Sequence, residues 1–368
     1  MSDIEEIKQR LKENKKSLAP KRGVSSGSTL LNLACTGDPD VGFFNGHYYL
    51  FVGDSQAGKS WLAMTVLAEA CINPSFDKYR LIHDNPERGV LMDYQRYFGN
   101  LGDRLESPSN RGSSKTLEDF YDNIDDISLE GKPFIYVLDS EDALQTETDI
   151  KKNRKDKKSR RKEIEDGEAE NVKTTGSYGT DKAKKNSAGL RMAHNCLEET
   201  DSMLFVIKQT RDNIGFDAMF NPKVRSGGRA LTFYATLELW FSIVGKIKKT
   251  IKGKKRSVGT ELKIQVKKNR IVGGDHNIDI PFYPSCGLDD VGSCVNFLVE
   301  ENHWSKSGSS VTAKDLDFKG TEEKLIEMIE LNNLEKDLRR ITAETWKTIE
   351  ESCQVNRKNR YSQSLTTR

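Results

Sequence analysis

The chain has 368 residues, 31% of them charged, and a formal net charge of only +2. This length allows one large core of roughly 250 residues with smaller appendages, and so many charged residues indicate solvated segments beside that core. A net charge this small gives no general argument for a nucleic-acid partner, so such an argument must come from local clusters of basic residues.

The cysteines and the apolar runs indicate the cellular compartment in which we expect the protein. The six cysteines are scattered without a C-x-x-C pair, which is typical of free thiols in a reducing compartment rather than of a disulfide or zinc framework. No apolar run approaches the roughly 20 residues that cross a bilayer, and the N-terminal residues lack the apolar centre of a signal peptide. We therefore expect a cytoplasmic protein, in the host cytoplasm if its source is viral, without a membrane partner.

The first predicted element is a helix near the N-terminus. Apolar residues at Ile4, Ile7, Leu11 and Leu18 form one narrow helical stripe among charged residues. Such a helix needs a surface to cover, either the protein's own core or a neighbouring subunit, and the spacing does not choose between them. We treat residues 1–22 as an N-terminal arm.

From Tyr48 onward, short apolar runs typical of strands alternate with helical runs. The expected strands are YYLFV, GVLMD, PFIYVLD and MLFVIKQ, and the expected helices include WLAMTVLAEA and LRMAHNCLEE. This alternation predicts an α/β fold with a mainly parallel sheet and helices on both faces. After Gly228, the runs LTFYATLELWFSIVGKIKK and TELKIQVKKNR predict antiparallel strands added at one edge of the sheet and joined by residues 250–259.

Residues 151–187 interrupt this pattern with almost no large apolar side chains, and they open with nine basic residues against one acidic residue in KKNRKDKKSRRK. Such a composition buries too little surface to offset the entropy of ordering, so we expect a mobile insertion. A second basic cluster, Lys246 to Arg256, is expected at a hairpin tip that either contacts duplex DNA or is simply solvated. We place the core at residues 23–296, a small C-terminal module at 297–352 and a disordered tail at 353–368.

The phosphate-binding motif G-x-x-x-x-G-K-[ST] is matched once, between a predicted strand and a predicted helix. Glycine-rich backbone N–H groups and a helix N-terminus favour phosphate oxygens, the motif lysine reaches the β and γ phosphates, and its hydroxyl residue ligates Mg²⁺. The sequence therefore predicts an ATP site with Mg²⁺ as its cofactor. The matching residues are Gly53, Asp54, Ser55, Gln56, Ala57, Gly58, Lys59 and Ser60, with Ser60 as the metal ligand.

An acidic residue at the end of a neighbouring buried strand normally completes such a site by holding the Mg²⁺ shell. Asp139 ends PFIYVLD and fits this role, with Asp93 at the end of GVLMD as a weaker alternative. Gln209 ends MLFVIKQ on the same predicted rim. Its amide can donate to a phosphate there and relay the presence of that phosphate to the following loop.

With these residues in place, the chain resembles a RecA-type recombinase, of the phage kind represented by UvsX, from about Gly23 to Trp304. The resemblance rests on VSSGSTLLNLACTG, on FVIKQTRDNIGFDAMFNPKVRSGGRALTFYA and on VKKNR. It implies a RecA-like P-loop ATPase core in which Gln209 senses the γ phosphate, while Lys268 and Arg270 reach the ATP of the neighbouring subunit. It also implies that the N-terminal arm docks on that neighbour.

The resemblance further implies two DNA-binding loops. The first falls within residues 151–187, at GSYGTDKAKK, and the second covers residues 211–229. Basic side chains on a glycine-containing loop suit a phosphate backbone that is bound without regard to sequence. The candidate DNA contacts are Lys182, Lys184, Lys185, Arg211, Lys223, Arg225, Gly227, Gly228 and Arg229.

One departure from the family concerns catalysis. The family places a glutamate two residues after a strand-ending aspartate, whereas this chain reads Asp93-Tyr94-Gln95. A glutamine orients water but does not accept its proton as a carboxylate does, so we expect slow hydrolysis unless Glu141 or another acid takes the role. The candidate catalytic residues are then Lys59, Gln95, Asp139 and Gln209, and the adenine-binding residues stay unassigned.

These inferences predict a DNA-dependent ATPase that acts as a DNA recombinase. It would form a helical filament on single-stranded DNA, pair it with duplex DNA and promote strand exchange in recombination and repair, with loading factors as further partners. One alternative is a recombination mediator or annealing protein with weak hydrolysis, which Gln95 favours. Another is a RecA-fold helicase or translocase, although replicative helicases of that kind carry a separate N-terminal domain, for which the residues before Gly42 leave no room.

Overall fold

The computed structural model describes residues 22–89, 92–110, 112–165, 178–212, 223–225, 228–355 and 357. The chain divides into two compact units, one ending at Asp289 and the other beginning at Asp290. The predicted arm, apart from Arg22, lies outside the described residues, as does most of the predicted tail. The first helix of the second unit begins at Asp290, seven residues before the expected start of the C-terminal module at Phe297.

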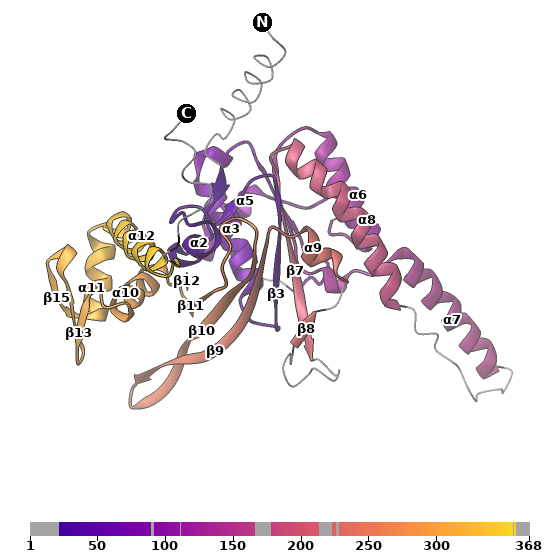
Figure 1. The fold of residues 1–368 in the computed structure, drawn as a ribbon. Helices are drawn as coiled ribbons and strands as arrows, with labels where there is room; N and C mark the ends of the chain where they lie inside the picture. Colours follow the sequence, from indigo (N-terminus) through magenta and orange to yellow (C-terminus); the bar gives the residue numbers. More distant parts are fainter. Residues whose placement is uncertain are drawn as a thin grey trace, which may run out of the picture. The chain divides into compact units, whose positions relative to one another are not determined.

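A mixed sheet organises the first unit, with the strand order β12-β11-β10-β9-β3-β7-β6-β4-β5 and β8 paired to β7 (Figure 1). The parallel members are β3 (His47–Gly53), β4 (Arg80–Asp84), β5 (Leu105–Glu106), β6 (Phe134–Leu138), β7 (Met203–Asp212) and β9 (Leu237–Ile251). The antiparallel strands at one edge are β10 (Lys254–Asn269), β11 (His276–Tyr283) and β12 (Gly287–Leu288), and β8 (Lys223–Arg225) is antiparallel to β7. The predicted α/β fold with added antiparallel strands is confirmed.

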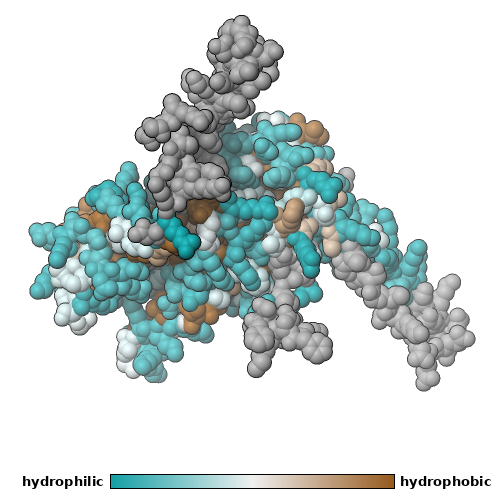
Figure 2. All heavy atoms as spheres, viewed as in Figure 1, coloured by the Kyte–Doolittle hydropathy of each residue, from teal (hydrophilic) through white to brown (hydrophobic). Residues whose placement is uncertain are grey.

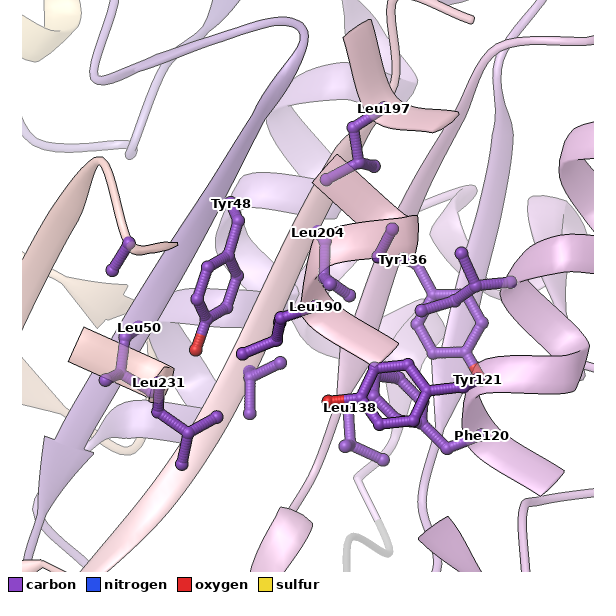
Figure 3. Close-up of a cluster of buried hydrophobic side chains, with 14 of the residues drawn as sticks. Tyr48, Leu50, Phe120, Tyr121, Tyr136, Leu138, Leu190, Leu197, Leu204 and Leu231 are labelled. Carbon is purple, nitrogen blue, oxygen red and sulfur yellow. The ribbon is translucent and has the colours of Figure 1, made fainter. Parts of the chain in front are cut away.

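Alternating side chains of the sheet face two apolar cores. Tyr48 and Leu50 of β3 belong to the buried cluster formed with helices α6 (Leu117–Leu129) and α8 (Tyr178–Glu199), shown in Figure 3. Tyr49 and Phe51 point to the other face, where both pack against the ring of Phe205. Period-two alternation in fully buried strands requires apolar residues at every position, which is why these strands read as continuous apolar runs.

The remaining elements of the first unit connect these strands. They are β1 (Gly23–Val24), α2 (Thr29–Thr36), β2 (Phe43–Phe44), α3 (Lys59–Ile72), η1 (Pro74–Phe76), α4 (Tyr94–Phe98), α5 (Leu101–Arg104), η2 (Glu141–Ala143), α7 (Glu147–Glu165) and α9 (Ala230–Tyr234). The second unit has its own core and consists of α10 (Asp290–Glu300), β13 (Ser305–Ser307), β14 (Ser310–Ala313), η3 (Lys314–Leu316), β15 (Phe318–Thr321), α11 (Glu322–Leu331) and α12 (Glu335–Ser352). Most of the surface visible in Figure 2 is hydrophilic. Among the described residues, no helix is both long enough and apolar enough to cross a membrane.

The strand expected at GVLMD is wrong in the residues that the structure describes. Gly89, Met92 and Asp93 lie outside any strand, and Asp93 instead caps α4 by accepting a hydrogen bond from the backbone N–H of Arg96. The strand of this region is β4, which precedes it. The sequence of β4, RLIHD, has only two apolar residues between polar ones. The apolar pattern therefore favours a strand at the longer apolar run that follows.

Two further segments differ from the expected local structure. The expected insertion at 151–187 contains helix at both ends, in α7 up to Glu165 and in α8 from Tyr178. Lysine, arginine and glutamate favour helix without burial, and pairs such as Lys151 with Glu147 add to this preference. The basic residues 246–256 lie mostly in strands, because the turn between β9 and β10 is only Lys252 and Gly253, both with positive φ.

We predict that Gly189→Ala destabilises the protein. Alanine normally stabilises a helix by about 1 kcal/mol relative to glycine, but a Cβ at Gly189 in α8 would lie closer than 3.0 Å to the ring of Tyr121 in α6. Forcing that overlap should cost about 1–3 kcal/mol in urea unfolding. The control is Gly102→Ala in α5, whose Cβ would meet only Tyr94 at an ordinary 3.5 Å. Equal stability of the two variants would contradict the close packing of α8 on α6.

Candidate functional site

The carboxyl ends of neighbouring parallel strands gather the residues predicted for the phosphate site. In the pairing of β3 with β7, Gly53 lies beside Gln209. In the pairing of β6 with β7, Leu138 lies beside Val206, so Asp139 follows at the same end. Parallel strands end at one edge of a sheet, where ligands of open α/β sheets bind. The phosphate loop, Asp139 and Gln209 are thus brought together.

The phosphate loop is held in place by close backbone contacts. A Cβ on Gly53 would lie 2.5 Å from the carbonyl oxygen of Phe241 in β9, so only glycine allows this pairing. Gly58 has a φ of 88° and begins α3, an arrangement that points N–H groups at the space above the helix. The ammonium of Lys59 donates to the carbonyl oxygens of Gly53 at 2.9 Å and of Asp54 at 2.6 Å. Burial lowers the pKa of Lys59, against the opposing attraction of Asp139 and other carboxylates.

Ser60 and Asp139 fit a divalent cation. Asp139 is 6% exposed, and the hydroxyl of Ser60 lies close enough to stabilise its carboxylate. Its Oδ2 is buried without a hydrogen-bond partner among the described residues. Burial raises the pKa of Asp139, the Ser60 hydroxyl opposes this effect, and Glu87 adds to it. A buried carboxylate oxygen without a donor, beside a hydroxyl, is a donor set suited to Mg²⁺.

Glu87 lies at the site although the sequence patterns do not single it out. It follows β4 by three residues, its carboxylate accepts a hydrogen bond from the Ser140 hydroxyl, and the side-chain amide of Gln209 donates to it at 3.2 Å. Gln95 stands instead on α4 with its side chain exposed. The available signal was an acidic residue shortly after the strand-ending Asp84, three residues on rather than the expected two, and the misplaced strand GVLMD concealed it.

The alternative base Glu141 is occupied by other partners. Its carboxylate is 1% exposed and forms ion pairs with Lys208 and, at 3.1 Å, with Lys182, while Asn186 donates to it at 2.8 Å. These partners occupy the carboxylate oxygens, so Glu141 is not placed to contact an attacking water. Lys182, predicted as a DNA contact, is itself held, because its ammonium also donates to the carbonyl oxygens of Glu141 and Leu144, each at 2.9 Å.

A cavity of about 460 Å³ opens beside the phosphate loop. Its lining combines residues 56–60 of the loop with Trp61, Met92, Leu262 and Phe282. The ring of Trp61 packs edge-on against Phe282, with centroids 4.8 Å apart. Apolar and aromatic walls next to polar backbone groups are typical of small-molecule sites. These walls can accept the base of a nucleotide whose phosphates lie on the loop, and the sequence patterns assign none of them.

Lys268 and Arg270 lie away from their own phosphate loop. Lys268 pairs with Glu238 in β9, and Glu238 pairs with Leu50 in β3, three residues before Gly53. Three residues of strand span about 10 Å. The ammonium of Lys268 donates to the carbonyl oxygens of Thr232 and Phe233 at the end of α9. The guanidinium of Arg270 lies 5.7 Å from the centre of the Phe233 ring, which is 63% exposed.

Residues just before and within the second candidate DNA loop contact the phosphate loop. Thr210 donates to the carboxylate of Asp54, and the ammonium of Lys223 lies 3.4 Å from the same carboxylate. The Thr210 hydrogen bond, against burial and together with Lys223, lowers the pKa of Asp54. Arg211 of β7 and Arg225 of β8 lie on the paired strands that carry this loop. Gly227, like the rest of residues 213–222 and 226–227, lies outside the described residues.

The remaining candidate DNA contacts lie on α8 and at the start of α9. Lys184 is exposed and Lys185 is half-buried on α8. Gly228 has a φ of 79°, and a Cβ there would lie 2.9 Å from Cβ of Ala183 on α8. Arg229 is exposed at the N-terminus of α9. The end of the second loop therefore lies against α8, which contains all of GSYGTDKAKK from Tyr178 onward, so this part of the expected first DNA loop is helical.

The β9–β10 hairpin carries a second group of cations. In the described chain, residues 242–251 of β9 pair only with β10 and residues 254–259 of β10 pair only with β9, and the hairpin extends beyond the sheet (Figure 1). Its exposed basic side chains include Lys248, Lys249, Lys254, Lys255 and Arg256. Lys249 stands directly opposite Arg256. Opposed like charges destabilise a strand pair, whereas a phosphate backbone would neutralise them.

Comparison with known proteins identifies the family whose model this chain matches. Residues 9–288 match the family model described as the RecA N-terminal domain. Protein RecA of Chlamydia trachomatis serovar L2 is 29% identical over 133 residues, which are 36% of this chain and 37% of the relative. Protein RecA of Thermus thermophilus is 30% identical over 147 residues, 40% of this chain and 42% of the relative. The matched part is less than half of the length of these relatives.

We predict that Asp139→Asn stabilises the nucleotide-free protein while weakening the Mg²⁺-dependent part of ATP binding. Because the folded-state pKa of Asp139 lies above its ordinary value of 3.8, its ionised form costs stability at neutral pH, and the cost disappears as the pH falls toward 3.8. Thermal unfolding should show a higher Tm for the variant at pH 7 and a smaller difference at pH 4.5. Calorimetric titration of ATP with and without Mg²⁺ checks the second part, and an unchanged Mg²⁺ effect would exclude Asp139 as a ligand.

Proposed function

The chain belongs to the RecA N-terminal domain family, and from this membership and the geometry of the site we propose that it is an ATP-dependent DNA recombinase. It forms a filament on single-stranded DNA, pairs that strand with duplex DNA and promotes strand exchange in recombination and repair. The observation that carries the proposal is the position of Gln209. It lies beside Gly53, donates to Glu87, and precedes Thr210, which binds the phosphate loop where the second candidate DNA loop begins.

We assign the residues at the sheet edge to separate tasks. The backbone of residues 53–60 and Lys59 hold the ATP phosphates, and Ser60 and Asp139 hold Mg²⁺, which neutralises charge on the transferred phosphoryl group when bound. Glu87 accepts the proton of the attacking water, because its carboxylate is exposed and adjoins Gln209. The apolar walls around Trp61 hold the adenine.

The rest of the proposal concerns assembly. Lys268 and Arg270, separated from their own loop by about 10 Å of strand, serve the ATP of a neighbouring protomer, and the exposed Phe233 beside Arg270 belongs to the same contact. The N-terminal arm, residues 1–22, docks on the neighbour. The UvsX-like phage kinship, the cytoplasmic location and the loading factors belong to this proposal and rest on the sequence patterns alone.

The position of Glu87 supports the recombinase over the mediator or annealing protein. The mediator is favoured by a missing catalytic carboxylate, on the assumption that Gln95 fills that position. With Glu87 hydrogen-bonded to Gln209 at the phosphate edge, a carboxylate is in place for hydrolysis. The helicase has no feature of the described residues in its favour.

The proposal is tested by ATP hydrolysis with and without single-stranded DNA, together with negative-stain images. We expect DNA to stimulate hydrolysis and filaments to form with ATP but not with ADP, because the γ phosphate is the group that Gln209 and the neighbour's cations contact. Lys59→Ala should lose both activities and serves as the control for contaminating ATPases. Hydrolysis indifferent to DNA, without filaments, would exclude a recombinase.

We predict that Glu87→Gln lowers the kcat of ATP hydrolysis by about 10²–10⁴-fold, the usual contribution of a general base. The affinity for ATP should change little, since the substitution keeps the size of the side chain and Glu87 lies outside the phosphate loop. Gln95→Ala is the matched control and should retain the wild-type kcat. Steady-state kinetics with saturating single-stranded DNA measure both variants, and the reverse order of effects would return the catalytic role to Gln95.

A further inference from the structure

Two carboxylates of η2, directly after Asp139 and Ser140, share one buried amine. The ammonium of Lys208 pairs with the carboxylate of Glu141 and, at 2.7 Å, with that of Asp142. Lys208 is fully buried in β7, one residue before Gln209. Burying charges in this way is costly, and well-packed apolar residues often stabilise a core at least as well. The cluster therefore calls for an explanation in terms of position rather than stability.

The first arm of the cluster reaches the nucleotide site. The second carboxylate oxygen of Asp142 accepts a hydrogen bond from the backbone N–H of Gln209 at 2.7 Å. The side chain of that glutamine donates to Glu87. Asp142 therefore holds the backbone of Gln209 in position, and the ion pair with Lys208 holds the side chain of Asp142.

The second arm reaches helix α8. Glu141 is bound by Lys182 and Asn186, which lie one turn apart on α8, and Tyr121 of α6 donates to the amide oxygen of Asn186 at 2.9 Å. Lys182 also donates to the carbonyl oxygens of η2 and of Leu144. Its ammonium has three oxygen partners within the protein and its side chain is only 17% exposed, so it has little capacity left for a phosphate.

Helix α8 also lies against the backbone of the second candidate DNA loop. Ala183, next to Lys182, is the residue that a Cβ on Gly228 would meet at 2.9 Å. Gly228 lies near the C-terminal end of the second candidate DNA loop, residues 211–229, and is described in the structure. A shift of Gln209 relative to η2 therefore acts, through Lys208, Glu141 and Lys182, on a helix packed against the end of that loop.

We propose that Lys208, Glu141, Asp142 and Lys182 form a bracket that makes DNA affinity depend on the bound nucleotide. The inference rests on the proposed function and adds to it a physical connection between Gln209 and α8. In this bracket Lys182 is a positioning residue and not a DNA contact. The bracket is distinct from the phosphate loop and from the basic side chains that face solvent.

The test compares the Kd for a fluorescent oligothymidylate in the presence of a non-hydrolysable ATP analogue and of ADP. For the wild type we expect the ADP value to exceed the analogue value by about tenfold or more. Lys182→Met should bring this ratio toward one by weakening binding in the analogue state, with the ADP value within about twofold of wild type. Lys184→Met replaces an exposed lysine of the same helix that is itself a candidate DNA contact. It is the matched comparison for an ordinary DNA contact, and it should weaken binding equally in both nucleotide states and leave the ratio unchanged.

A second variant separates the bracket from simple damage to α8. Asp142→Ala breaks the first arm without changing any residue of α8, because Asp142 lies in η2. It should lower the same ratio. If the two arms act as one unit, the double variant has the ratio of the single variants rather than the product of their losses. Circular dichroism and urea unfolding without nucleotide establish that each variant is folded.

Three outcomes decide the matter. A ratio near one in both single variants, with no further loss in the double variant, supports the bracket. A lower affinity of Lys182→Met in both nucleotide states, with the ratio preserved, would make Lys182 an ordinary DNA contact and overturn the inference. A wild type whose DNA affinity ignores the nucleotide would instead count against the proposed function.

Discussion

The pairing of Gly53 with Gln209 in adjacent parallel strands is the constraint on which the site depends. Because β3 ends at Gly53 and the pairing of β7 with β3 ends at Gln209, the phosphate loop and the segment that leads into the second candidate DNA loop diverge from neighbouring positions, although β7 itself continues to Asp212. The absence of a side chain at Gly53 lets β9 approach from the other side. The other groups of the site at this edge, including the hydroxyl of Ser60 and the carboxylate of Glu87, lie around that pair of residues.

The parts of the fold and site that could be predicted from the sequence are those encoded by short-range patterns. The phosphate loop is one such pattern, and Asp139 directly after β6 is another, because buried parallel strands read as apolar runs that stop at a polar residue. The strand end predicted at Gln209 is wrong, because β7 continues to Asp212 by pairing with β8, although Gln209 is the last residue that pairs with β3. Glu87 could not be predicted in this way. Its strand has only Leu81 and Ile82 as an apolar centre, so a longer apolar run nearby attracts the assignment.

Long-range contacts set the second limit of the sequence patterns. The ion pair of Lys182 with Glu141 joins residues 41 positions apart, and that of Lys208 with Glu141 joins residues 67 apart. From the sequence, Lys182 is indistinguishable from Lys184, since both are lysines on one charged stretch. Only the packing of α8 over η2 turns the first inward and leaves the second in solvent, which is why their roles as DNA contacts could not be separated earlier.

The hairpin of β9 and β10 has a consequence for the behaviour of many copies in solution. Beyond Phe241 and before Thr260 its outer backbone groups have no neighbouring strand in the described chain, and unpaired strand edges are templates for aggregation. The lysines along both strands make the edges of any two molecules repel one another. This protection weakens as salt screens the charges, so a concentrated stock of the protein should keep its colloidal stability best at low ionic strength.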